Sequence, residues 1–474
     1  MRGPSTGLQS PWLLLSLLAL SVSLSLGCHP RNVEFIRVTA DSVALTHIRV
    51  IDGTGTRAKD DQTIIIQSGR IRNIGNSSAI SITGIAQVME LQGYTALPGL
   101  VGMHDHLFYA VPPGDQFREM LPSFPQLYLA AGVTSVRTAG ALDIRAERRM
   151  KERIEAGKDI GPHLYLTTPY VDPDPGSPEN PGGYAKAVEQ LISGGIDSVK
   201  VYTHARTSEL AAVIQVAHRS GVRVTGHLCV IGFTQAALMG IDNLEHGLIV
   251  DSEFYSKPQP GACPDWWNTA NELTRMDVHG PEIQRLIGTL VEHHVAVTST
   301  LPVFESLSGT RVPLLDDRVI NLLAPELRFV YTAQKDTVSG RPDTVWGPML
   351  KKEMEFEREF VRAGGLLVAG VDPTGWGGVI AGYGDQHEVE LLVESGFTPE
   401  QAIQVATHNG AVLLGHADQV GTLSNGKEAD IAVVRGNPAS SIGDIRQTEI
   451  VFKDGVGYDS AAILRSLAGK IGRH

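Results

Sequence analysis

Six side chains in the middle of the sequence have the chemistry of ligands for divalent metal ions. Imidazole and carboxylate groups are ligands that zinc favours, and two such groups one residue apart on a strand point to the same face. His104 and His106 have this spacing, whereas Asp105 between them would point to the other face. Because a His-x-His pair alone is a weak signal, its meaning depends on the other candidates, which are Lys200, His227, His246 and Asp372.

Each candidate lies at the end of an apolar or small-residue run that is typical of a buried strand. Lys200 lies in the run VKVY, where a solvated lysine is hard to place. Strands and helices alternate here, which predicts βα units and a parallel sheet. Eight strands indicate an α/β fold of the TIM type, a (β/α)8 barrel whose active site lies at the carboxyl ends of the strands. The predicted strands cover 96–106, 132–140, 163–170, 197–203, 223–230, 242–247, 295–301 and 366–373.

Apolar residues at helical spacing predict helices between these strands. Residues 398–401 (TPEQ) combine an N-cap threonine, a proline at the first helical position and a capping-box glutamine, so a helix should begin there. The segment around 251–350 is too long for one connection, and we expect an insertion with its own helices on the active-site side. Trp266 and Trp267 within it could shape a pocket. The apolar stripes are Tyr184, Val188, Leu191 and Ile192, then Leu210, Val213, Ile214 and Ala217.

Both ends of the chain are rich in short β-branched runs separated by glycine, which predict strands and hairpins. The simplest interpretation is a small β-sandwich domain built from residues 33–97 and 411–474, with the barrel formed by residues 98–410. Two unrelated β segments are the alternative, which periodicity alone does not exclude.

Residues 1–28 have the layout of a secretory signal peptide. Arg2 is the only charge before an apolar stretch from Trp12 to Leu26, which Gly27 and Cys28 follow. We therefore expect an exported protein of the periplasm or cell envelope. Cys28 resembles the lipid-attachment site of bacterial lipoproteins, so contact with a membrane is expected only through a lipid anchor there. A permanent membrane span is disfavoured because the apolar run is short.

Composition excludes nucleic acid as a partner, because the formal net charge is −12 and phosphate binding needs a basic surface. Apolar residues make up 42% of the chain, which is typical of a globular protein with an ample core. Besides Cys28 the chain has only Cys229 and Cys263, whose pairing cannot be read from sequence. Cys229 follows His227 by two residues, so we expect it near the metals but not as a ligand.

The order H-x-H, Lys, His, His, Asp over eight strands resembles the amidohydrolase superfamily. The segments LPGLVGMHDHL, GVTSVRTAG, NLEHG and GKEADIAVV are similar to strand ends and to the β-domain of that superfamily. The most similar branch contains imidazolonepropionase-like and prolidase-like (Xaa-Pro dipeptidase-like) enzymes. The resemblance implies two divalent metal ions, most typically Zn²⁺. His104, His106 and Asp372 would hold the first, His227 and His246 the second, and Lys200, N6-carboxylated by carbon dioxide, would bridge them.

The same resemblance implies hydrolysis of an amide bond in a small dipeptide, Xaa-Pro or similar, or in an N-acyl amino acid. A hydroxide that bridges the metals would attack the carbonyl, and Asp372 would carry its proton to the leaving amine. The segment 386–415 is similar to the barrel-closing segment of that branch, which makes His387 and Glu388 candidates for the pocket rim. Further candidates for contacts with substrate, each with a structural alternative, are Tyr202, His204, His163 and Arg137.

Two other functions compete with a binuclear hydrolase. A mononuclear deaminase or imidazolone-type cyclic amide hydrolase would generally lack the bridging lysine and have a glutamate near the fifth-strand histidine. Gly226, Leu228 and Cys229 flank His227 instead. A non-catalytic protein that binds metal or ligand on the same scaffold is disfavoured because all six ligand positions are retained. The expected partner is a small molecule, and the sequence leaves open whether the chain forms a homo-oligomer.

Overall fold

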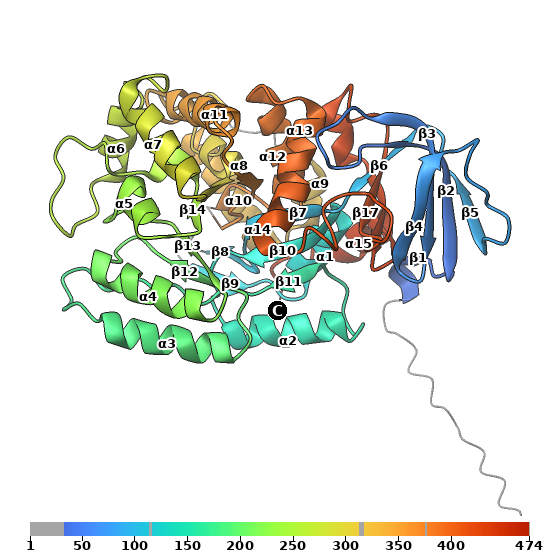
Figure 1. The fold of residues 1–474 in the computed structure, drawn as a ribbon, viewed down its shortest axis with the longest axis horizontal. Coiled ribbons are helices and arrows are strands. Elements are labelled where there is room, and N and C mark those ends of the chain that lie inside the picture. Colours follow the sequence, from blue (N-terminus) through green and yellow to red (C-terminus); the bar gives the residue numbers. More distant parts are fainter. Residues whose placement is uncertain (1–32, 113–115, 312–316, 375–376, 474) are drawn as a thin grey trace, which may run out of the picture.

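Figure 1 shows a β-rich part next to a larger part that is rich in helices. The fold is that of a computed structural model of the 474-residue chain, which describes residues 33–112, 116–311, 317–374 and 377–473. The predicted signal peptide, residues 1–28 with Cys28, lies outside the described residues. No helix within these ranges is long and apolar enough to cross a membrane.

Strands from both ends of the chain pair in one mixed sheet, in the order β1-β19-β18-β17-β6-β2-β3-β4, with β5 on β2. The two ends meet at the antiparallel pair β6–β17, where Leu97 lies opposite Ala432. Apolar residues at a spacing of two, such as Ile64 and Ile66, bury one core. The described strands from the two chain ends form a single sheet, so the predicted β-sandwich is not shown. The strands are β1 Ile36–Val38, β2 Ser42–Val50, β3 Lys59–Gln67, β4 Arg70–Asn76, β5 Gln87–Glu90, β6 Tyr94–Pro98, β17 Ile431–Arg435, β18 Thr448–Lys453 and β19 Val456–Asp459.

Eight parallel strands follow one another in chain order at the centre of the larger part. They pair as β11-β10-β7 and as β12-β13-β14-β15-β16. At one seam between the two groups Thr168 N donates to Ser198 O (3.1 Å), and at the other Asp372 N donates to His104 O (2.9 Å). The architecture is therefore a TIM-barrel-like α/β fold. The strands are β7 Leu100–Asp105, β10 Val133–Thr138, β11 His163–Tyr165, β12 Ser198–Val201, β13 Arg223–Gly226, β14 Asn243–Glu245, β15 Ala296–Ser299 and β16 Leu367–Ala369.

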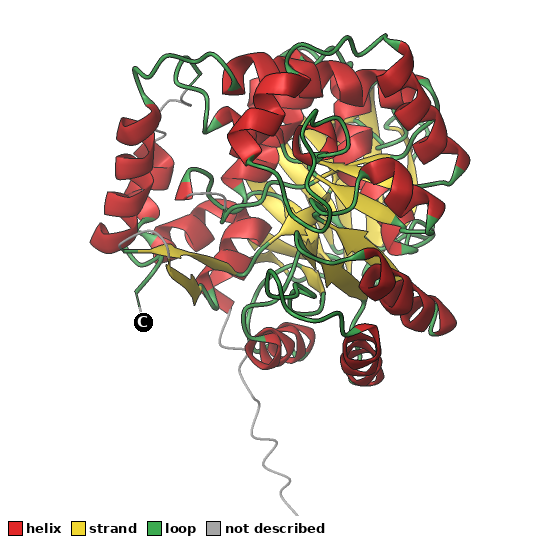
Figure 2. Ribbon diagram, turned by 90° about the vertical axis from the view of Figure 1, so that its left-hand side faces the viewer, coloured by secondary structure: helices red, strands yellow, loops and turns green. Residues whose placement is uncertain are grey.

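Helices lie around these strands, as Figure 2 shows. Val188 of α3 and Leu210 of α4 lie on the predicted apolar stripes and are buried. At the start of α13, Thr398 Oγ1 accepts from Gln401 N (3.2 Å) and Gln401 Oε1 accepts from Thr398 N (3.0 Å), which confirms the predicted capping box. The main helices are α1 Ser123–Ala130, α2 Ile144–Glu155, α3 Pro181–Ser193, α4 Thr207–Arg219, α5 Phe233–Leu238, α7 Pro281–Glu292, α11 Trp346–Arg362, α12 Tyr383–Glu394, α13 Pro399–Gln404 and α15 Ser460–Leu467.

The segment 251–350 is not one continuous insertion. It contains α7 and β15, which are regular members of the βα series, because the apolar β-branched run of β15 pairs with β14 on one side and β16 on the other. The additional helices therefore fall into two places. Helix α6 (Trp266–Leu273) precedes α7, while α8 (Leu301–Glu305), α9 (Asp317–Leu322) and α10 (Pro325–Val338) lie between β15 and α11.

Candidate metal centre

The six predicted ligands all lie at the carboxyl ends of parallel strands. Parallel strands end at the same edge of their sheet, so this placement brings side chains from five strands towards one place. His104 lies in β7, His106 directly after it, Lys200 in β12, His227 directly after β13, His246 directly after β14 and Asp372 shortly after β16.

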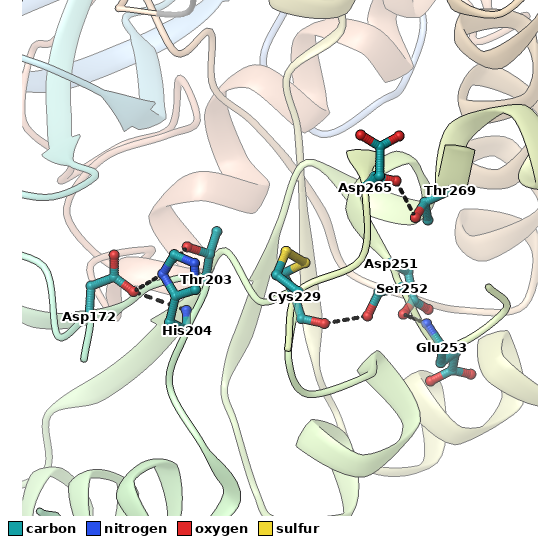
Figure 3. Close-up of a disulfide and its surroundings, with 10 residues drawn as sticks. Asp172, Thr203, His204, Cys229, Asp251, Ser252, Glu253, Asp265 and Thr269 are labelled. Carbon is teal, nitrogen blue, oxygen red and sulfur yellow. Dashed lines mark hydrogen bonds and ion pairs between the residues drawn. A yellow bond between two sulfur atoms is a disulfide. The ribbon is translucent and has the colours of Figure 1, made fainter. Parts of the chain in front are cut away.

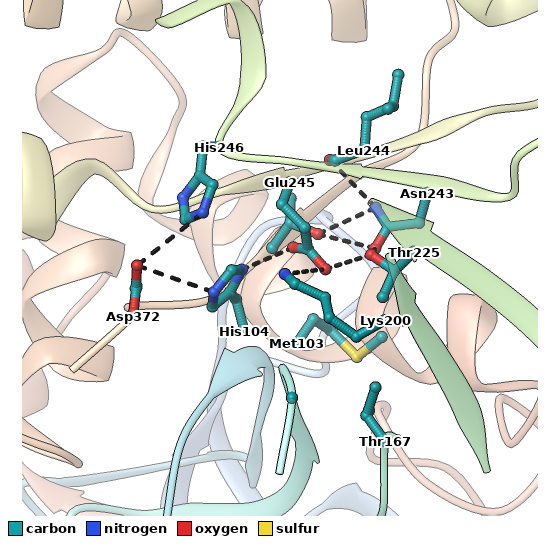
Figure 4. Close-up of polar contacts among 12 residues, drawn as sticks. Met103, His104, Thr167, Lys200, Thr225, Asn243, Leu244, Glu245, His246 and Asp372 are labelled. Atoms are coloured by element: carbon teal, nitrogen blue, oxygen red, sulfur yellow. Dashed lines mark hydrogen bonds and ion pairs between the residues drawn. The ribbon is translucent and has the colours of Figure 1, made fainter. Parts of the chain in front are cut away.

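Asp372 lies in front of three of the histidines. Its Oδ1 lies 3.3 Å from His106 Nε2. Its Oδ2 lies 3.9 Å from Nε2 of both His104 and His246, as Figure 4 shows. Ligand atoms of His104, His246 and Asp372 lie within 4.8 Å of one another, so one cation could contact all three. Burial opposes the negative charge of Asp372, but the hydrogen bond from His106 and the nearby histidines outweigh burial and hold its pKa well below the usual range.

Two of these ligands depend on an unusual backbone conformation. His246 has a φ of 70° and Asp372 a φ of 44°, in the left-handed region that non-glycine residues rarely adopt. Neighbours on an extended strand point to opposite faces. The conformation of His246 ends this alternation, so Glu245 and His246 both contact His104. Strained backbone is often kept at functional sites, which agrees with a ligand role for both residues.

Glu245 is the residue that sequence reasoning missed. Its side chain is fully buried, with Oε2 2.8 Å from His104 Nδ1 and Oε1 accepting from Arg137 Nη2 at 2.8 Å. Lys200 Nζ lies 3.7 Å from the same Oε1. Burial opposes ionisation, but Lys200 and Arg137 outweigh it and hold the pKa of Glu245 well below its usual range. The signal was present in NLEHG, where Asn243 and Glu245 share a strand face and both bind Arg137.

The histidines are oriented through their second ring nitrogens. His104 Nδ1 pairs with Glu245, and His246 Nδ1 lies 2.7 Å from Thr300 Oγ1. These contacts direct the Nε2 atoms towards Asp372, and within the described residues the buried His246 Nε2 has no hydrogen-bond partner. Histidines that bind metals are held in this way, and an unpartnered Nε2 in a buried cluster fits a metal ligand.

Lys200 and His227 complete the cluster. Lys200 is 1% exposed, and its Nζ makes no hydrogen bond to any described residue. Burial lowers the pKa of this amine, although the Glu245 carboxylate opposes that effect. The His227 ring centroid lies 4.5 Å from that of His246, and burial lowers the pKa of both rings well below the usual value. Neutral imidazole is the form that binds metals.

A cavity of about 500 Å³ opens in front of His227, His246 and Asp372. Tyr202 lines it, with its ring 4.9 Å from that of His227. Cys229 forms a disulfide with Cys263 that borders the cavity (Figure 3), so Cys229 is not a metal ligand. The rest of the lining consists of Phe117, Thr203, Val250, Ser252, Pro264, Trp266, Thr269, Val303, Phe304, Leu307 and Thr374.

Two predicted substrate contacts lie outside this lining. Arg137 is 3% exposed, and its guanidinium donates hydrogen bonds to Glu245, Asn243 and the carbonyl of Met103. The structure therefore makes it a buried counter-charge rather than a group that faces the cavity. His204 Nδ1 lies 3.1 Å from Asp172 Oδ1 (Figure 3), and His204 does not line the cavity, although its neighbour Thr203 does.

The other candidates are also held by protein groups elsewhere. His387 borders a different cavity of about 270 Å³ and contacts Glu305 and Glu390. Glu388 is fully buried, with Oε2 accepting from Leu301 N at 3.0 Å, so neither residue lies at the rim of the metal-site cavity. His163, at the first residue of β11, lies 3.3 Å from the carboxylate of Asp430, which directly precedes β17 of the mixed sheet. It therefore links the two parts of the molecule.

The model of the amidohydrolase family matches residues 95–457 of this chain. Imidazolonepropionase from Herpetosiphon aurantiacus is 22% identical over 406 residues, which are 80% of this chain and 84% of that protein. A solved Xaa-Pro dipeptidase with bound methionine has a TM-score of 0.66 at 21% identity, covering 88% of this chain and 100% of that one. Phenylurea hydrolase B has a TM-score of 0.65 at 18% identity, covering 91% and 100%. These two structural likenesses concern the fold.

Proposed function

The chain belongs to the amidohydrolase family and is a hydrolase acting on carbon–nitrogen bonds, and we propose that it is a binuclear metal-dependent amide hydrolase. The observation that carries this proposal is the Asp372 carboxylate facing the Nε2 atoms of His104, His106 and His246 at the end of a cavity. The first bonds to test are those of Xaa-Pro dipeptides and N-acyl amino acids.

In this proposal two Zn²⁺ ions occupy the cluster. His104, His106 and Asp372 would hold one ion, and His227 and His246 would hold the other. Such ions polarise a carbonyl and lower the pKa of water. The residues present fit this group, because unpartnered nitrogen atoms, neutral imidazoles and a carboxylate converge in a buried site.

Lys200 is proposed to bridge the ions as a carbamate. A buried amine with a lowered pKa is more readily neutral, and a neutral amine adds carbon dioxide, forming a C–N bond and releasing one proton. The product is an anion that suits a position between two cations. Its nitrogen keeps one hydrogen, for which Glu245 Oε1, 3.7 Å from Nζ, is a nearby acceptor.

Asp372 is proposed to move the proton during hydrolysis. Its carboxylate accepts the proton of the attacking water and returns it to the leaving amine. Thr374 Oγ1 donates to Asp372 Oδ1 at 2.8 Å, which fixes the orientation of the carboxylate and leaves Oδ2 for the proton.

We further propose that the protein is exported to the periplasm or cell envelope, with the domain limits expected from the sequence. Support comes from the disulfide Cys229–Cys263, since disulfides persist mainly in oxidising compartments.

Metal analysis of the purified chain tests the function. With zinc and bicarbonate in excess, we expect about two equivalents per chain and hydrolysis of amides. Lys200→Met should bind about one equivalent or less and lose activity, and Asp372→Asn should lose activity while remaining folded. His218→Gln, which changes an exposed histidine, is the control. The proposal would be contradicted if the unaltered protein bound one zinc equivalent per chain, or if Lys200→Met bound two.

A further inference from the structure

The outer wall of the metal-site cavity is apolar. Trp266, Val303, Phe304 and Leu307 line it, and Phe117 adds a ring that is 47% exposed. An aromatic side chain left this exposed beside a cavity is available to contact a ligand. With a volume of about 500 Å³ the cavity has the size of a typical small-molecule site. A ligand with its reacting bond at the metal end would place its remaining part against this wall.

Three of the five hydroxyl-bearing side chains of the lining donate within the protein, and the other two are Tyr202, beside His227, and Thr203. Ser252 Oγ donates to the carbonyl of Cys229, Thr269 Oγ1 donates to Asp265 O (2.9 Å) and Thr374 Oγ1 donates to the Asp372 carboxylate (2.8 Å). A hydroxyl has one proton to give. These three groups can therefore accept a hydrogen bond from a ligand, but they have no proton left for a ligand carboxylate.

No lysine or arginine is found among the described residues that line this cavity. Arg137 is hydrogen-bonded to the buried Glu245, and His204 is paired with Asp172, so neither lines the cavity. An anion that lies against the outer wall, away from the metal end, would be buried with no lysine or arginine of the described lining beside it, which is strongly disfavoured. A free carboxylate on the part of the substrate that extends from the metal end to this wall would lie against aromatic and aliphatic side chains.

We infer that the natural substrate is an uncharged amide that carries an aromatic-sized apolar group, without a free carboxylate on the part that lies against this wall. This inference rests on the proposed hydrolase function and narrows its substrate class. The proposal is tested with three amides of the same type. N-phenylacetylpyrrolidine is neutral and carries a phenyl ring. N-phenylacetylproline has one carboxylate in addition, and N-acetylpyrrolidine lacks the phenyl ring.

The zinc-loaded full chain should cleave N-phenylacetylpyrrolidine with a kcat/KM about 10–100-fold above that of either comparison substrate. Trp266→Ala should reduce the advantage over N-acetylpyrrolidine. Its matched control is Trp267→Ala, because Trp267 is the next residue, is 44% exposed and does not line the cavity. Leu307→Arg, which places a cation in the wall, should shift the preference towards N-phenylacetylproline.

Calorimetric binding to zinc-loaded Asp372→Asn separates this inference from the proposed function. Equal or better cleavage and binding of N-phenylacetylproline would overturn the inference and leave the hydrolase in place. Absence of cleavage of all three amides by a protein with two metal equivalents would count against the proposed function for these bonds. Even then, tighter binding of the neutral aromatic amide than of the acid would support the inferred ligand class, and the reverse order would overturn it.

Discussion

Stability should depend on pH through the ion-pair cluster around His387. Its Nε2 lies 2.6 Å from Glu305 and its Nδ1 lies 2.7 Å from Glu390. Arg446 donates to Glu390, and Arg311 Nη2 lies 2.9 Å from Glu305. Burial opposes a charge on His387, but the two carboxylates outweigh burial and raise its pKa from 6.5 to about 9. The charged ring therefore stabilises the folded state.

The sign follows from the raised pKa. The stabilisation is fully present below the unfolded-state pKa of 6.5 and is lost as the pH rises through about 9. A rise of this size corresponds to about 3 kcal/mol, at about 1.4 kcal/mol per pH unit. Because the arginines share both carboxylates and the His387 side chain is 24% exposed, we expect about 2 kcal/mol.

The assay is urea unfolding of the unaltered chain and of His387→Gln at about pH 6 and about pH 9.5. The difference in the free energy of unfolding should fall from about 2 kcal/mol to below about 0.5 kcal/mol. His218→Gln, in an exposed pair with Asp242, should cost less than about 1 kcal/mol. An equal effect of His387→Gln at both pH values would refute the charged-ring explanation. A large rise in KM in this variant would instead assign His387 to substrate binding.

Two further predictions concern buried groups behind and beside the metal site. Arg137→Met should lower the free energy of unfolding by about 3–5 kcal/mol because it leaves the Glu245 carboxylate buried without the cation that is hydrogen-bonded to it. Urea denaturation measures this, and a loss below about 1 kcal/mol would show that the pair is not needed. Replacing Cys229 and Cys263 together by serine should cost about 3–4 kcal/mol, since the disulfide joins residues 34 apart in sequence. An unchanged unfolding midpoint would indicate that the two thiols are not bonded.

The sequence predicted the groups that meet at the candidate metal centre because their placement depends on a simple rule. A polar residue at the end of a buried parallel strand faces the same edge as its counterparts, so His227 and Asp372 could be assigned without knowing the helices. This rule did not predict Glu245, because alternation along a strand would direct its side chain to the opposite face from that of His246. Only the left-handed φ of His246 brings both residues to His104.

Partners that depend on distant segments could not be predicted. Arg137 looked suited to a substrate carboxylate, but the structure places it beside Glu245, 108 residues later. His387 was expected at the pocket rim, but the carboxylate it meets on α8 puts it at a different cavity. The apolar wall of the metal-site cavity is assembled from several loops and short helices, and no single stretch of sequence contains its pattern.

The sequence by itself determined the number of parallel strands, the histidine, lysine and aspartate side chains at their ends, the capping box at Thr398 and the β character of both chain ends. These features follow from local sterics and from periods of two and 3.6 residues, which short stretches encode. The tertiary structure alone decided the disulfide, the counter-charges of the buried ion pairs and the surface offered to a substrate. Those depend on which distant groups share a dry interior, where each buried charge must find a partner.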